Sequence, residues 1–184
     1  GVTVRVPHLA WVSMHGEAKR DYPASISYQS PWYDEYSYIE NHFARLNTAL
    51  TRGKPVVKVG VIHPIESYWL HWGPSAQTAL VRSAMDSDFS NITSWLLYGS
   101  VDFDYICESL IPELRGIAAS SDMLGKMKYD VIIVPGCETL RSTTLDFLEN
   151  FKSRGGKLIF AGKAPVLENA VPSVRGKILY DDSE

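Results

Sequence analysis

The feature that most constrains the fold is a set of three short, almost entirely apolar runs. They read VVKVGVI at 56–62, YDVIIVP at 129–135 and KLIFAG at 157–162. Apolar runs without polar alternation are typical of strands that are covered on both faces, as in parallel sheets. Segments of helical character separate the runs. The chain therefore predicts an α/β fold, an open parallel sheet with helices on both faces.

The segments between these runs have the periodicity of helices and of one further strand. VDFDYI at 101–106 predicts a short strand, and ESLIPEL at 108–114 predicts a short helix. A helix is expected over about 141–153, ended by Gly155 and Gly156. Another helix is predicted from an apolar side formed by Leu80, Ala84, Met85, Phe89, Ile92 and Leu96.

Two further segments complete the expected order. HPIESYWLHWGP at 63–74 is interpreted as a bulky aromatic loop after the first strand, and KILY at 177–180 predicts a last strand. The chain starts in a strand-like run without an initiator methionine, and it stops soon after 177–180. We therefore expect a piece of a longer protein, in which the sheet domain, residues 54–184, is truncated at its C-terminus.

Residues 1–53 predict a strand, a long loop and a helix. Alternating valines at 2–6 indicate the strand, and an aromatic stretch of about two dozen residues indicates the loop. The helix is predicted from an apolar stripe at spacings of three and four, and Gly53 suits its end. The stripe consists of Tyr36, Ile39, Phe43, Leu46 and Leu50. One such β/α unit cannot form a core alone.

Charge and cysteine content restrict the partners and the compartment. The formal net charge is −3, which gives no reason to expect nucleic acid or an anionic membrane surface as a partner. No apolar run approaches the roughly 20 residues of a membrane span. The only cysteines, Cys107 and Cys137, form no disulfide framework, which favours a reduced, cytoplasmic setting.

Cys137 lies in a glycine-containing turn, VPGCETL, directly after an apolar strand, where nucleophiles are often found. A thiol of ordinary pKa needs a base or a helix N-terminus to become a nucleophile at neutral pH. The sequence has no histidine after Cys137. A thiol enzyme that uses Cys137 therefore stays an alternative, beside the reading of Cys137 as a small packed residue.

Cofactor and metal sites are not expected. An open, doubly wound sheet of this kind could bind a small ligand at its switch point, and this second alternative, a small-ligand-binding module, stays open. The 63–74 loop, however, is bulky, and Pro64 removes a backbone donor, so we expect neither flavin nor nucleotide. The pairs His8 and His15, and His63 and His71, lack the spacing and the cysteines of a zinc site, so no metal is expected.

Four segments resemble, in order and spacing, the class I glutamine-amidotransferase-like domain of multi-domain glycoside hydrolases. They are KVGVIHP, LLYGSVDFDYI, YDVIIVPGCETL and FKSRGGKLIFAG. The trimerisation domain of family 42 β-galactosidases is the best-known example, and rhamnosidase-like enzymes share the arrangement. The stretch before them, from VPHLAW to HFARLN, looks like the last strand, loop and helix of a β/α barrel. The resemblance implies a flavodoxin-like sheet that follows a barrel remnant.

The resemblance also implies a function. The chain would be a non-catalytic C-terminal region that supports the barrel of the parent glycoside hydrolase, borders its sugar cleft and mediates homo-oligomerisation. Its partners would be the rest of that parent protein and a carbohydrate substrate. The two carboxylates of glycoside hydrolysis would lie in earlier barrel strands, so this chain alone should be inactive.

In the amidotransferases that this domain resembles, the nucleophilic cysteine occupies an elbow one strand later than Cys137. At that place this sequence reads AGKAP, with Gly162 and Lys163 and no thiol or hydroxyl. The resemblance thus implies that the thiol machinery has been lost.

Two aromatic loops are the candidate sugar-contacting segments. Sugars bind by stacking their C–H faces on aromatic rings and by hydrogen bonds from their hydroxyls. The loop after the last barrel strand would border the cleft. The candidates are His8, Trp11, His15, Arg20, Tyr28 and Trp32 in the first loop and His63, Glu66 and Trp69 in the second. The structural alternative is that these side chains attach the barrel to the sheet domain.

Overall fold

The computed structural model describes residues 4–6, 15–18 and 27–183. The chain divides into two compact units, Gly1–Pro55 and Val56–Glu184. Each unit is described by itself.

The first unit is built around one helix, α1 (Tyr36–Leu50), as its apolar stripe predicts. Two short 3-10 turns, η1 (Gly16–Ala18) and η2 (Tyr33–Glu35), precede it. No side chain of α1 is buried, so its apolar stripe remains largely open. The described part of the predicted first strand, residues 4–6, has no strand pairing, and its other residues lie outside the described ranges.

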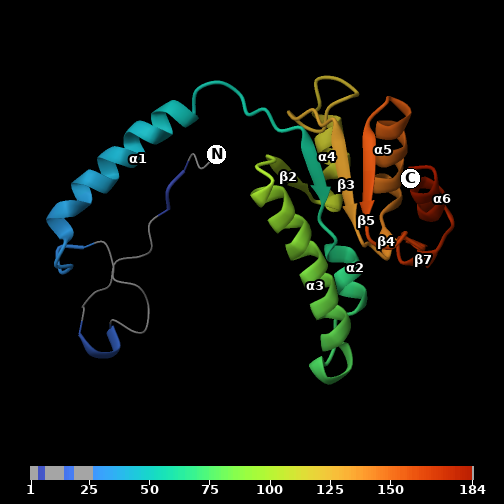
Figure 1. The fold of residues 1–184 in the computed structure, drawn as a ribbon, viewed down its shortest axis with the longest axis horizontal. Helices are drawn as coiled ribbons and strands as arrows, with labels where there is room; N and C mark the ends of the chain where they lie inside the picture. Colours follow the sequence, from blue (N-terminus) through green and yellow to red (C-terminus); the bar gives the residue numbers. More distant parts are fainter. Residues whose placement is uncertain (1–3, 7–14, 19–26, 184) are drawn as a thin grey trace. The chain divides into compact units, whose positions relative to one another are not determined.

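The second unit contains the three strands that the apolar runs predict and the short strand predicted at 101–106. They are β1 (Val59–Ile62), β2 (Phe103–Ile106), β3 (Val131–Pro135) and β5 (Lys157–Ala161). Their order in the sheet is β2-β1-β3-β5, and every pair is parallel (Figure 1). The chain moves from β1 outward to β2 and then across to β3 and β5. The direction of winding therefore reverses between β1 and β3, where open sheets form a crevice at their carboxyl ends.

Helices cover both faces of this sheet, as the alternating pattern predicts. On one face, Ile132 and Leu158 pack with Leu145 and Leu148 of α5 (Ser142–Ser153). The short helix α4 (Ile111–Gly116), preceded by η3 (Glu108–Leu110), lies on the same face.

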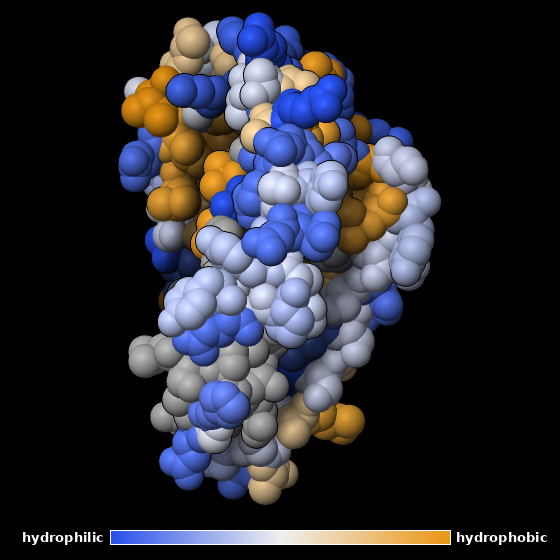
Figure 2. Space-filling view, turned by 90° about the vertical axis from the view of Figure 1, so that its left-hand side faces the viewer, coloured by the Kyte–Doolittle hydropathy of each residue, from blue (hydrophilic) through white to orange (hydrophobic). Residues whose placement is uncertain are grey.

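The other face is covered by α3 (Ser75–Tyr98), whose Ile92 packs against Val61 and Ile133. This helix of 24 residues is much longer than the strands, and Figure 1 shows it extending past them. Leu80, which the periodicity placed on the packed side, is 86% exposed, because this part of α3 lies beyond the sheet. On the face of the molecule drawn in Figure 2, apolar patches lie among a largely hydrophilic surface.

The prediction of a last strand at 177–180 is wrong, because these residues belong to α6 (Arg175–Asp181). Leu179 is buried in the core, whereas Ile178 is exposed, which is the pattern of a helix with one packed side. Lys177 and Asp181 form an ion pair at helical spacing. A run of only four residues does not distinguish the two periodicities.

Two other elements were not expected. The 63–74 segment, interpreted as a loop, contains the helix α2 (Ile65–Leu70). A second, small sheet consists of β4 (Thr139–Leu140), β6 (Leu167–Glu168) and β7 (Val171–Pro172), in the order β4-β6-β7. In the described part of the chain, no helix combines the length and the apolar character of a membrane span.

Candidate functional site

The carboxyl end of the sheet carries a cluster of polar side chains, and Ser67 holds it together. Ser67 is buried on α2, and its Oγ donates a hydrogen bond to the Thr139 carbonyl at 3.0 Å. The same Oγ accepts the backbone N–H groups of Glu138 at 3.0 Å and Thr139 at 3.1 Å. One hydroxyl thus ties the helix after β1 to the turn after β3.

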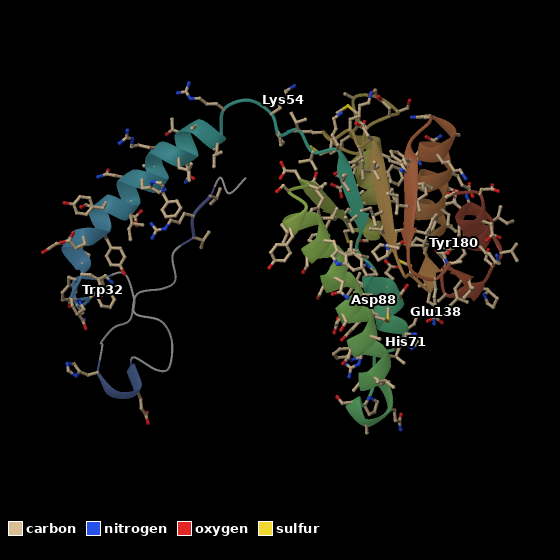
Figure 3. The ribbon with its side chains drawn as sticks, viewed as in Figure 1. Trp32, Lys54, His71, Asp88, Glu138 and Tyr180 are labelled. Atoms are coloured by element: carbon tan, nitrogen blue, oxygen red, sulfur yellow. The ribbon has the colours of Figure 1, made fainter. Side chains whose placement is uncertain are left out.

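Two ion pairs join the same elements nearer the surface. Arg141 Nε lies 2.5 Å from Glu66 Oε1. His71 Nε2 lies 2.6 Å from Glu138 Oε2, and Figure 3 labels these two residues. The His71–Glu138 pair is partly exposed, and pairs of this kind contribute little to stability. Their effect is to fix the orientation of α2 against the turn after β3.

Below these pairs lies a buried carboxyl group, Glu108, which is only 1% exposed. Its Oε2 accepts the Arg141 N–H at 2.8 Å. Its Oε1 and the Thr144 hydroxyl are both buried, and the Thr144 hydroxyl, close to this carboxyl group, acts to lower its pKa. Burial raises the pKa of Glu108 above its ordinary value of 4.5, against the opposing effect of the Arg141 N–H.

Cys137 lies in the interior of this cluster and is 1% exposed. Burial, and then the nearby charge of Glu108, raise the pKa of its thiol well above the ordinary range, while a hydrogen bond with Ser67 opposes them. A thiol that is both sealed from solvent and protonated is a poor nucleophile. These facts count against a thiol enzyme that uses Cys137.

The place where the resemblance locates a nucleophile is filled by backbone. Gly162 directly follows β5 and has a φ of 140°, a conformation that glycine adopts far more readily than other residues. A Cβ on Gly162 would lie 2.7 Å from the Cα of Gly136, in the turn that holds Cys137. No side chain fits at this elbow without moving the neighbouring turn.

Of the candidates in the second loop, Glu66 and Trp69 lie together on α2. The Trp69 side chain is 59% exposed, and that of Trp72 is 69% exposed. The Arg82 guanidinium lies 4.9 Å from the centre of the Trp72 ring. The ring of His63 instead lies near Phe89 of α3 and Tyr105 of β2, with 5.3 Å and 6.5 Å between ring centres.

The candidates in the first loop belong to the other unit. His8, Trp11 and Arg20 lie outside the described residues. His15 and Tyr28 are exposed. Trp32 is half-exposed, and its indole N–H donates to the Tyr36 hydroxyl at 3.0 Å.

The sequence reasoning missed the residues that organise the cluster. Ser67, Glu108, Glu138 and Arg141 were not candidates. A topological signal was available, because Ser67, Glu108 and Glu138 all follow strands of one parallel sheet and therefore meet at its carboxyl edge. Among the described residues, no group of three or more His, Cys, Asp or Glu side chains is arranged as metal ligands.

No protein-family model matches the chain, and neither a curated protein nor a solved structure is significantly similar to it. A functional proposal consequently depends on the residues themselves.

Proposed function

We propose that the chain is a non-catalytic region of a glycoside hydrolase, which supports the catalytic barrel and contacts its sugar substrate. The observation that carries this proposal is the exposure of Trp69 and Trp72 on a segment that is fixed to the core. Large flat rings beside hydrogen-bonding groups are the usual means of binding sugars.

The fixation of α2 supports a sugar-contacting role. Ser67 holds one side of the helix, and the Glu66–Arg141 and His71–Glu138 pairs hold its flanks. A platform that is already ordered loses little conformational entropy on binding. Arg82 lies over the Trp72 ring, so Trp69 is the freer stacking surface.

We also propose a more specific fold for the second unit and an origin for the first. The second unit would be the flavodoxin-like layer of an amidotransferase-like domain without its thiol chemistry. The β2-β1-β3-β5 order, the sealed Cys137 and the glycine at position 162 support this. The first unit would be the last β/α unit of the barrel, and the unburied stripe of α1 supports a further partner surface there, in the barrel or in an oligomer.

The sugar-contacting role can be tested by titrating the chain with oligosaccharides of galactose or rhamnose and following the indole N–H resonances by NMR. We expect saturable shifts at Trp69 and Trp72, and a loss of binding in Trp69→Ala. Trp95→Ala is the matched control, because Trp95 is 68% exposed on α3. Equal losses in both variants, or no saturable shift at all, would contradict the proposal.

A further inference from the structure

A cavity of about 340 Å³ lies at the opposite, amino-terminal edge of the same sheet. Asp130 directly precedes β3, and Gly155 and Gly156 directly precede β5. The cavity is enclosed by the loop around 121–130, the last turn of α5 and this glycine turn. Its volume is within the range of small-ligand pockets, on the order of 300–1,000 Å³.

The apolar part of the cavity wall is aromatic. Phe147 and Phe151 of α5 have ring centres 6.3 Å apart, and Tyr129 adds a third, nearly buried ring. Gly156 allows this arrangement, since a Cβ there would lie 2.4 Å from the Phe151 ring. Because Phe147 and Tyr129 are nearly buried, Phe151 offers the accessible apolar face of the wall, next to bare backbone.

The polar part of the wall carries balanced charge. Two cations, Lys128 and Arg154, and two carboxylates, Asp122 and Asp130, line the cavity. Lys128 Nζ is 2.6 Å from Asp122 Oδ2, and Arg154 donates to the Ser121 carbonyl. Such a wall offers donors and acceptors together without an excess of either charge.

The Asn150 side chain offers the cavity a hydrogen-bonding group. Its carboxamide lines the cavity and makes no hydrogen bond within the described ranges, although it can donate two and accept others. It lies one helical turn before Arg154, at the end of α5. The carbonyl groups at a helix C-terminus disfavour anions, so the position suits a neutral ligand.

We propose that this cavity binds one ring of a neutral sugar. The C–H face of the ring packs on Phe151, while its hydroxyls exchange hydrogen bonds with Asn150 and with the N–H groups of Arg154 that do not donate to Ser121. The inference does not depend on the proposed function, because this cavity and Trp69 lie at opposite ends of the strands.

The test is a set of NMR titrations of the full chain, followed at the backbone amides of Asn150, Gly155 and Gly156. The probes are D-glucose, D-galactose and L-rhamnose as neutral sugars, with D-glucuronate and benzoate as anions. We expect saturable shifts at these amides with at least one neutral sugar and weaker effects from both anions. Asn150→Ala should weaken the binding at least about fivefold, through the loss of its hydrogen bonds.

Two variants separate this cavity from the carboxyl edge. Trp69→Ala should leave the shifts at Gly155 and Gly156 unchanged, and so should Thr143→Ala at the exposed start of α5. The proposal is overturned if no neutral sugar gives saturable shifts there, if an anion binds more tightly, or if Asn150→Ala binds as the parent chain does.

Discussion

Gly162, directly after β5, packs so closely against Gly136, directly after β3, that no side chain fits on Gly162. A Cβ on Gly162 would be 2.7 Å from the Gly136 Cα and 3.0 Å from its backbone nitrogen. The turns that follow β3 and β5 are therefore packed directly against each other. The sealed Cys137 thiol belongs to the same arrangement.

Replacing Gly162 by serine should place a hydroxyl at this elbow at a large cost in stability. We expect the free energy of unfolding to fall by about 2–4 kcal/mol, from backbone strain together with the clash. Urea denaturation measures this change. Gly155→Ala is the matched control. The φ of Gly155 is also positive, at 86°, but a Cβ there meets nothing within 4 Å. We therefore expect the free energy of unfolding to fall by only about 1 kcal/mol. Equal costs for the two variants would refute the close contact.

Removing the Ser67 hydroxyl should loosen the cluster at the carboxyl edge. Ser67→Ala leaves the N–H groups of Glu138 and Thr139 without the oxygen that both now donate to. We expect a loss of about 2–3 kcal/mol in the free energy of unfolding. Ser109→Ala, at an exposed position, should cost less than about 0.5 kcal/mol. A Ser67→Ala variant as stable as the parent would mean that water replaces the hydroxyl.

Glu108 should make the unfolding free energy depend on pH. Its folded-state pKa is raised above 4.5, so the folded chain holds a proton that the unfolded chain releases. This contribution is fully present below pH 4.5 and is lost as the pH rises towards the folded pKa, with a slope of at most about 1.4 kcal/mol per pH unit.

Glu108→Gln should remove that slope. The free energy of unfolding of the variant should therefore depend less on pH than that of the parent chain between pH 4.5 and 7. Chemical denaturation at a series of pH values measures it. Glu113→Gln, an exposed change on α4, should keep the slope of the parent. The same slope in Glu108→Gln and the parent would show that Glu108 is not the titrating group.

The two cysteines should differ in their reactivity. Cys137 is buried, whereas Cys107 is half-buried beside Ser109. We expect iodoacetamide to label Cys107 first and Cys137 only as fast as the chain opens, because the thiol must become exposed and ionised to react. Mass spectrometry of tryptic peptides separates the two rates. Rapid labelling of native Cys137 at pH 7 would revive the thiol-enzyme alternative.

The parallel sheet could be predicted from the sequence because apolar runs of five or more residues are long enough to define strands. α2 could not, since its six residues include only one that is buried, Ser67, and that residue is polar. The prediction of a strand at 177–180 was wrong for a similar reason, because the apolar residues of this run suit a helix as well as a strand. The short strands β4 and β6 are two residues each and pair only through the tertiary fold.

The candidate site was predicted in part. Glu66 and Trp69 stand out by type in an aromatic segment, and the structure places both on α2. The Glu108 carboxyl group and the Arg141 backbone N–H meet only because β2 and β3 end at one edge, although the two residues are 33 positions apart in the sequence. Such a meeting depends on strand order, which no local pattern in the sequence specifies.

The most direct test of the sugar-contacting role is to measure intermolecular NOEs between a bound oligosaccharide and the tryptophan rings. The account predicts NOEs from sugar C–H protons to the ring protons of Trp69, and none to Trp95. NOEs to Trp95 alone, or none to any tryptophan at saturating sugar, would contradict it.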